Sequence, residues 1–250
     1  MPNLTPLSLK DAPSLIERVF PAQKISAEAQ KERKAGAGQT LTALGSYWKG
    51  RKPLIMVRAI VLGCLLPVTE DLAADLRCFE MLMGIDDAAF GRREPTKKLK
   101  LIEVAERLTL RNPWDFFDYT NPKGFYDPEE IENLQFPLDL VKYPKLKIRW
   151  QRGLQEEKKH RLLAQALEGF TYEKKVDICM RPEELDQEML YSPIWKDVNA
   201  HLAPFGIEAY SHEQLTTQLG ILRYGHRPKV GDTFCGGGSI PFEAARLGCD

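Results

Sequence analysis

Apolar residues recur at helical spacing in several stretches of this sequence. Within residues 70–84, one helical face would carry Leu72, Leu76, Phe79 and Met83. Acidic residues open that stretch and Gly84 closes it, as at the ends of many helices. Similar spacing over 95–110 and 154–170 predicts two further helices, the second ending near Gly169.

The most apolar stretch, PLIMVRAIVLGCLLP, runs from Pro53 to Pro67 and holds Arg58 in its middle. It is shorter than the ~20 apolar residues that a membrane-spanning helix needs, so it predicts a buried core helix and no membrane partner. The chain does not open with a basic head followed by an apolar run, which indicates no signal peptide. A cytoplasmic protein is therefore expected.

Residues 111–146 are rich in proline and aromatic side chains, and we expect irregular packed structure there. A group of aromatic residues in this segment could stack on nucleic-acid bases. Such groups more often belong to a core, and the core interpretation is favoured here. The group consists of Trp114, Phe116, Phe117 and Tyr119.

The end of the chain shows the most informative local order. Ser211 and Gln214 form a Ser-x-x-Gln capping box that opens a helix ending at Gly225. The buried face of that helix would carry Leu215, Leu219 and Leu222. A short strand over 226–234, a glycine-rich loop and a helix over 240–248 are predicted to follow.

Helix, strand, glycine loop and helix in this order are typical of the start of a doubly wound α/β sheet. The sequence therefore predicts an α/β protein with two parts. Residues 1–205 would form a mostly helical domain. Residues 206–250 would form the beginning of a Rossmann-like domain, its first strand and helix.

Composition narrows the class of protein. The 250 residues carry 35 basic and 35 acidic side chains, so no net charge attracts nucleic acid, and 43% hydrophobic residues exclude wholesale disorder. Five cysteines, an odd number without C-x-x-C spacing, favour free thiols over a disulfide framework or a zinc ribbon.

The histidines lack metal-ligand spacing, so no metal site is predicted. All four are expected at the surface or in caps: His160, His201, His212 and His226.

The glycine-rich loop lies in the segment VGDTFCGGGS. A phosphate-binding P-loop is excluded because Ser239 follows Gly238 without a lysine, and a dinucleotide fingerprint lacks its third glycine because position 241 is proline. The remaining pattern is Asp-x-Phe-x-Gly-x-Gly. It resembles motif I of class I S-adenosylmethionine-dependent methyltransferases, in the form found in DNA amino-methyltransferases. A strand–helix turn without a ligand is the alternative interpretation.

That resemblance implies roles for the matching residues. Asp232 would organise the loop and the methionine amino end of S-adenosyl-L-methionine, and Phe234 would flank the cofactor. Gly236 and Gly238 would admit its methionine and ribose portion, with Cys235 and Gly237 in the same cofactor-binding loop. A nucleophilic role for Cys235 is disfavoured, because cytosine methylation uses a separate Pro-Cys loop; this thiol is expected to pack within the loop.

A wider resemblance covers both ends of the chain. Residues 20–67 and 222–250 resemble a family of adenine-specific DNA methylases that carry an N-terminal domain of unknown function and are often encoded beside anti-phage defence genes. The family implies DNA and other defence-system subunits as partners. It also implies an acidic residue for the cofactor ribose and an Asn/Asp-Pro-Pro-Tyr/Phe catalytic loop further along. The sequence contains no Pro-Pro pair, so we expect an N-terminal portion of a DNA adenine-N6 methyltransferase that is inactive alone.

Residues 47–54 form a second candidate site within a basic stretch. The stretch from Lys24 to Arg58 contains eight basic residues and only two glutamates. Trp48 and Lys52 loosely match motif X, a segment that closes over the cofactor in some adenine methyltransferases. Arg51, Lys52 and Arg58 could instead bind nucleic-acid phosphates, or the segment is a solvated basic loop before a helix. These three interpretations stay open.

Two rival functions remain at this stage. A non-catalytic DNA-binding or assembly module of a defence complex fits the missing catalytic loop. Methylation of RNA or protein is the enzymatic alternative, because motif I alone does not specify the methyl acceptor.

Overall fold

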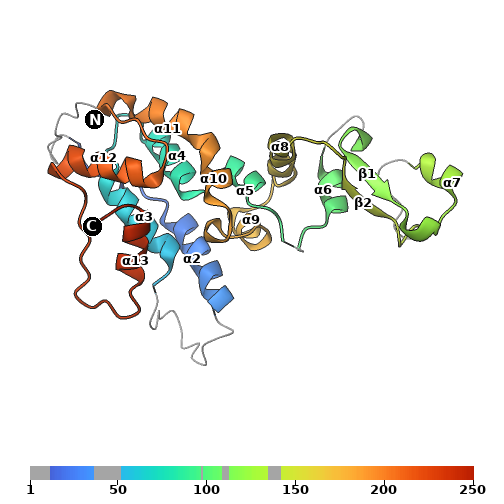
Figure 1. Ribbon diagram of the computed structural model, residues 1–250, viewed down its shortest axis with the longest axis horizontal. Helices are drawn as coiled ribbons and strands as arrows, with labels where there is room; N and C mark the ends of the chain where they lie inside the picture. Colours follow the sequence, from blue (N-terminus) through green and yellow to red (C-terminus); the bar gives the residue numbers. More distant parts are fainter. Residues whose placement is uncertain (1–11, 37–51, 97, 109–112, 135–141) are drawn as a thin grey trace. The chain divides into compact units, whose positions relative to one another are not determined.

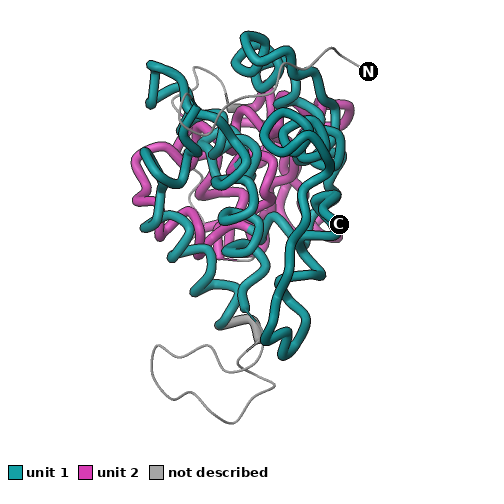
Figure 2. Tube along the Cα trace, turned by 90° about the vertical axis from the view of Figure 1, so that its left-hand side faces the viewer, with its two compact units in different colours: residues 1–89, 180–250 teal, residues 90–179 magenta. Residues whose placement is uncertain are grey.

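The computed structural model describes residues 12–36, 52–96, 98–108, 113–134 and 142–250. The chain divides into two compact units (Figure 2), unit 1 with residues 1–89 and 180–250, and unit 2 with residues 90–179. The segments on both sides of residue 205 belong to unit 1, and the boundary expected there stays a prediction. Within the described ranges, no helix combines the length and the apolarity that crossing a membrane requires.

Unit 1 is a bundle of helices (Figure 1). In chain order they are α1 (Leu15–Arg18), α2 (Ala22–Gly36), α3 (Leu54–Leu65), α4 (Leu72–Met83), α10 (Gln187–Tyr191), α11 (Trp195–Leu202), α12 (His212–Tyr224) and α13 (Ser239–Arg246). Helix α5 (Asp87–Arg92) spans the boundary between the two units.

Helix α3 forms the core of unit 1, as its apolar sequence predicts. It packs against α1, α2, α4, α12 and α13. Residues on several sides of the helix are buried, including Ile55, Val57, Leu62 and Leu65. A helix that is hydrophobic all round needs such surroundings, because any face turned to water would expose apolar surface.

Both ends of α3 are satisfied by charged side chains from other helices. At its N-terminus, the Glu32 carboxylate accepts hydrogen bonds from Leu54 N (3.0 Å) and Ile55 N (3.4 Å). At its C-terminus, the buried Arg223 guanidinium donates to the carbonyl oxygens of Leu65 and Leu66. A carboxylate at the amino end and a cation at the carboxyl end both interact favourably with the helix dipole. These contacts therefore stabilise α3 in its position.

The helices expected from periodicity are present, with details that differ. Asp71 caps α4, Gly84 ends it in a left-handed conformation, and Phe79 and Met83 are buried, whereas Leu72 is exposed. In α12, Ser211 Oγ accepts from Gln214 N (3.2 Å) as expected, but the Gln214 side chain accepts from Tyr210 N and does not complete the capping box.

Unit 2 holds the only β-strands among the described residues, β1 (Phe117–Thr120) and β2 (Lys147–Trp150). They pair antiparallel, and helices α6 (Leu101–Arg107), α7 (Pro128–Glu132), α8 (Glu156–Ala166) and α9 (Tyr172–Ile178) complete the unit. The segment expected to be irregular therefore contributes a regular strand. Phe117 is buried, which agrees with the core role expected for the aromatic group.

The strand expected over 226–234 does not form as a regular strand. The described residues thus make a largely helical protein with one small antiparallel sheet. Among the described residues, the strand-like backbone hydrogen bonds of segment 226–234 go only to residue 250. A parallel strand normally becomes regular only when it pairs with a neighbouring strand over several residues.

Candidate functional site

The glycine-rich loop lies between an extended segment and helix α13. Val230 N donates to Asp250 O (2.9 Å), and Asp250 N donates to Pro228 O (2.8 Å). Asp250 therefore bonds to two residues of the other segment that lie two positions apart, Pro228 and Val230. This is the hydrogen-bond pattern of neighbouring parallel strands. Helix α13 connects the two partners, as a crossover helix does in a β-α-β unit.

The loop has a defined backbone conformation. Asp232 Oδ1 accepts a hydrogen bond from Phe234 N (3.0 Å), so this carboxylate stabilises the turn. Gly236 and Gly238 adopt positive φ angles of 50° and 70°, which residues with a Cβ rarely adopt. Gly238 N donates to Cys235 O (2.7 Å), which closes the turn directly before α13.

In the part of the chain that the structure describes, little lies against the outer side of this loop. A Cβ added at Gly236 would meet nothing nearer than Phe234 O at 3.6 Å, and one added at Gly238 nothing nearer than Cys235 Sγ at 4.0 Å. Phe234 is 92% exposed, an unusual environment for a large aromatic side chain. Cys235 is also exposed, which contradicts the expectation that it packs within the loop. Among the described residues, nothing fills the space beside these two glycines, which leaves room for a ligand there.

A contact from the N-terminal region reaches the end of the loop. The Lys52 backbone N donates to Ser239 Oγ (3.1 Å), and Ser239 is the buried first residue of α13. The structure therefore brings Lys52, one of the residues predicted to bind the cofactor, next to Gly238. Trp48 and Arg51 lie outside the described residues.

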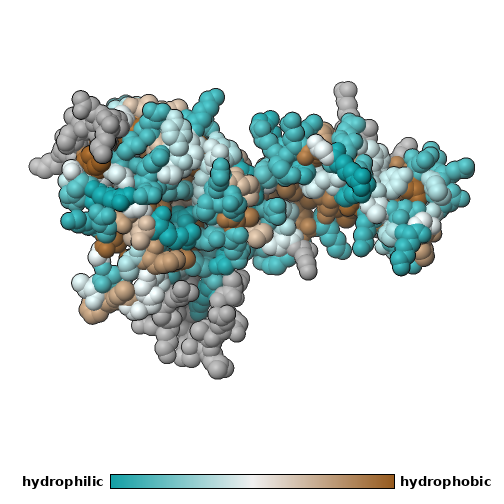
Figure 3. All heavy atoms as spheres, in the orientation of Figure 1, coloured by the Kyte–Doolittle hydropathy of each residue, from teal (hydrophilic) through white to brown (hydrophobic). Residues whose placement is uncertain are grey.

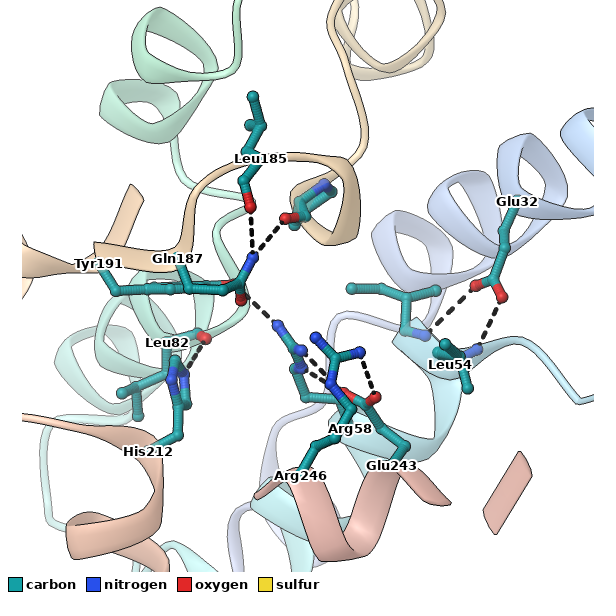
Figure 4. Close-up of polar contacts among 12 residues, drawn as sticks. Glu32, Leu54, Arg58, Leu82, Leu185, Gln187, Tyr191, His212, Glu243 and Arg246 are labelled. Carbon is teal, nitrogen blue, oxygen red and sulfur yellow. Dashed lines mark hydrogen bonds and ion pairs between the residues drawn. The ribbon is translucent and has the colours of Figure 1, made fainter. Parts of the chain in front are cut away.

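Arg58 was a candidate for nucleic-acid binding, but the structure places it inside unit 1 (Figure 4). The residue is 3% exposed and forms an ion pair with Glu243 of α13, with Nη2 and Oε1 separated by 2.8 Å. Arg58 Nε also donates to Glu243 Oε1 (2.8 Å), and Nη1 donates to the Tyr191 hydroxyl (2.9 Å). In this conformation the guanidinium does not reach a phosphate, because its donors are used internally.

Glu243 lies at the centre of this buried network. It is completely inaccessible to solvent, and its second oxygen accepts from Arg246 Nη1 (3.0 Å). Burial alone would lower the pKa of Arg58, but Tyr191 and Glu243 raise that pKa above its ordinary value. The network ties α13, which follows the glycine loop, to α3 and α10 (Figure 4).

Sequence reasoning missed Glu243 and Tyr191. A signal was present, because Arg58 interrupts an apolar run and Glu243 lies beside buried Ala244 and four positions before buried Leu247. A charged residue at a core position requires a buried partner. The pattern shows that both residues need partners, but it does not show that they are partners of each other.

A cleft of about 1030 Å³ lies elsewhere in unit 1, beside α10 and α11. Tyr191, Trp195 and His212 line it, and none of the glycine-loop residues does. The His212 ring contacts both aromatic rings edge-on, at centroid distances of 4.5 and 5.6 Å. Its Nε2 lies 2.8 Å from Leu82 O, a group that can only accept, so this nitrogen carries the proton. Burial and the nearby Arg58 charge lower the pKa of His212 to about 4.

Two of the remaining histidines have a structural partner or a surface position. His201 Nε2 lies 2.9 Å from Asp75 Oδ1, and His226 is exposed. His212 was expected at the surface or in a cap, and its ring is instead held between aromatic side chains. In the part of the chain that the structure describes, no three His, Cys, Asp or Glu side chains gather in a geometry that could hold a metal ion.

The loop and its surroundings can serve as a small-molecule site. The N-terminus of α13 presents backbone N–H groups and the positive end of a helix dipole. Asp232 adds a carboxylate, Phe234 an exposed aromatic ring, and Lys52 a nearby cationic residue. These groups suit a ligand that combines charged ends with a planar ring.

Comparison with known proteins adds one finding for the N-terminal region. Residues 19–82, 64 of the 250, match the family described as "Protein of unknown function (DUF1156)". This segment contains α2, α3 and all but the last residue of α4, and it includes Glu32, Lys52 and Arg58. No curated protein matches the chain. No solved structure matches it either.

Proposed function

We propose that this chain supplies the S-adenosyl-L-methionine-binding loop of a DNA adenine-N6 methyltransferase with a Rossmann-like fold, acting in an anti-phage defence system. The observation that carries the proposal is the open glycine loop from Asp232 to Gly238, set between an extended segment and α13. The parallel-type bonds between 228–230 and 250 support the Rossmann-like part.

The loop residues fit this cofactor. The two positive-φ glycines leave a surface that a Cβ would begin to fill, and the exposed Phe234 ring is available to stack on a planar group. Asp232 would hold the methionine amino group while it keeps the turn closed through Phe234 N. Lys52, held beside Ser239 by its backbone, would border the cofactor from the N-terminal region.

When bound, S-adenosyl-L-methionine supplies an electrophilic methyl group. The chain's own contribution is to fix the cofactor's position, and correct positioning alone supplies a large part of the rate in such transfers. An adenine in duplex DNA must leave the base stack to reach such a site. We assign no catalytic residue, because no Asn/Asp-Pro-Pro-Tyr/Phe sequence occurs in these 250 residues.

One second candidate is a DNA-binding or assembly module without catalysis of its own, which requires no such catalytic loop. The two proposals differ in cofactor binding, which only the first requires. Methylation of RNA or protein would use the same loop and differs only in the acceptor.

Photochemical cross-linking with methyl-labelled S-adenosyl-L-methionine tests the proposal. We expect label on a peptide that contains Phe234 and Cys235, and its loss when unlabelled S-adenosylhomocysteine competes. Transfer of the label to duplex DNA, RNA or protein, with N6-methyladenine measured by mass spectrometry, then identifies the acceptor. If the loop peptide stays unlabelled in the folded protein, the cofactor proposal fails. That result would favour the DNA-binding or assembly module without catalysis.

A further inference from the structure

The β1–β2 ribbon of unit 2 has two chemically different faces. In the antiparallel register, Phe117 pairs with Trp150 and Tyr119 with Ile148, and these four side chains share one face. Phe117 stacks on Trp150 with ring centroids 4.6 Å apart, while Tyr119 and Ile148 pack on the buried cluster of Ile131, Tyr143 and Leu146. This apolar face is therefore the inner face.

The outer face is polar and mainly basic. It carries Lys147 opposite Thr120 and Arg149 opposite Asp118. Lys147, Arg149 and Thr120 are exposed. Figure 3 shows hydrophilic side chains gathered over the β1–β2 region. The outward side chains of the two strands themselves include no apolar one, so an apolar protein partner or a lipid interior has little to bind on the strands.

The sequence around β2 concentrates positive charge, although the net charge of the whole chain is zero. Residues 142–152 contain Lys142, Lys145, Lys147, Arg149 and Arg152 and no acidic residue. Lys145, Arg149 and Arg152 are exposed, and the Lys145 ammonium lies 3.4 Å from the ring centroid of Phe125, itself 56% exposed. Basic side chains next to an exposed aromatic ring form a surface suited to nucleic acid.

Most of this charge is not neutralised locally. Lys142 already forms an ion pair, because its Nζ lies 2.9 Å from Glu130 Oε1. The contact between Arg149 Nε and Asp118 Oδ2 is long, 3.7 Å, and both side chains are partly exposed, so it is weak. Neither Lys147 nor Arg152 has an ion pair within the described residues. Three to four cations thus remain available to an external anion.

We propose that the outer face of the β1–β2 ribbon, with Lys145, Lys147, Arg149 and Arg152, binds the phosphate backbone of duplex DNA. A two-stranded antiparallel ribbon is one of the few elements whose width matches the major groove. Its basic outer face meets the phosphates, while the inner face stays packed in unit 2. The choice of DNA over RNA rests on the proposed function. The electrostatic argument for phosphate binding does not rest on it.

Fluorescence anisotropy with a labelled DNA duplex tests this proposal on the whole chain. We compare the wild-type protein with the double variant Lys147→Gln/Arg149→Gln between low and moderate salt. The variant should bind roughly tenfold or more weakly at low salt, and the slope of log K against log[salt] should decrease by about 2, the value for two lost phosphate contacts. Both side chains are exposed, so thermal unfolding should be unchanged.

The matched control removes the same charge elsewhere in unit 2. Arg161→Gln/Lys174→Gln changes two exposed cations of α8 and α9 and should leave affinity and salt slope nearly unchanged. Equal loss in both double variants, equal binding of anionic lipid vesicles, or no duplex binding by the wild type would each overturn the proposal. An RNA duplex bound as tightly as DNA would overturn the choice of DNA. Cofactor cross-linking to the glycine loop does not depend on these lysine and arginine residues, so the two proposals fail separately.

Discussion

Arg58 of α3 and Glu243 of α13 form a buried ion pair with Nη2 and Oε1 separated by 2.8 Å, although 185 positions separate them in the sequence. Glu243 has no solvent exposure and Arg58 has 3%. The pair connects the segment that matches the family of unknown function to the helix that follows the glycine loop. Packing of the N-terminal helices therefore determines where the N-terminus of α13 lies.

Removal of one partner should be costly. Arg58→Met leaves the Glu243 carboxylate buried with Arg246 as its remaining cationic contact in the network. The loss of a buried partner typically destabilises by about 3–5 kcal/mol, and we expect a decrease of that size in the free energy of unfolding. Urea denaturation followed by circular dichroism measures it.

The double variant Arg58→Met/Glu243→Leu is the control for that experiment. It removes both charges, so most of the lost stability should return, giving a coupling energy of at least about 2 kcal/mol. Additive effects of the two substitutions would show that the ion pair is not a unit, contrary to the structure.

Gly238 should be required for binding more than for stability. Gly238→Ala forces a Cβ into a left-handed conformation, which costs about 1 kcal/mol. Gly225→Ala is a matched control, because Gly225 has a φ of 76° and open space around it but lies at the end of α12, away from the glycine loop. Both variants should lose similar stability in thermal unfolding, whereas only Gly238→Ala should lose S-adenosyl-L-methionine binding. Unimpaired binding by Gly238→Ala would contradict the role given to this loop.

His212 should make stability depend on pH. Its pKa in the folded protein is about 4, below the ordinary value of 6.5, so the unfolded chain takes up the proton first as pH falls. Stability should therefore be highest above about pH 6.5 and decrease towards pH 4, by up to roughly 3 kcal/mol from this group.

His212→Gln isolates this contribution, because the amide can still donate to Leu82 O but does not titrate. Denaturation midpoints measured from pH 7.5 to 4.5 should fall less steeply in the variant. Identical profiles would show that the imidazole is not held neutral in its aromatic surroundings.

The cysteines offer a direct probe of the loop surface. Cys64 and Cys235 are exposed, whereas Cys78, Cys179 and Cys249 are buried. Burial raises the pKa of Cys78 to about 12, so this thiol should react with N-ethylmaleimide only after unfolding. S-adenosylhomocysteine should slow modification of Cys235 and leave Cys64 unaffected, as measured by mass spectrometry of the peptides. Equal rates at Cys235 with and without this ligand would place the ligand elsewhere.

Several helices could be predicted from the sequence because their signals are local. The apolar run of α3, the Ser211 cap of α12 and the left-handed glycines that end α4 and α12 all lie within a few residues of the structure they specify. The turn at Asp232 belongs to the same class, since its hydrogen bond spans two residues.

Features that depend on distant partners could not be predicted in this way. The alternation of apolar and polar residues in FDYT and KIRW is too short to distinguish strands from loops, and the two strands pair across 33 positions, Phe117 with Trp150. Arg58 looked like a phosphate ligand because it lies in a basic stretch, and only the three-dimensional structure reveals Glu243 beside it.

The central claim is that the loop from Asp232 to Gly238 binds S-adenosyl-L-methionine, and calorimetric titration of the whole chain tests it most directly. We predict saturable binding of one cofactor per chain, and loss of at least about tenfold in affinity (~1.4 kcal/mol) in Asp232→Ala, which removes the bond to Phe234 N. The Gly225→Ala protein should bind as the wild type does. A folded wild-type protein that shows no binding, or an Asp232→Ala variant that binds equally well, would contradict the account.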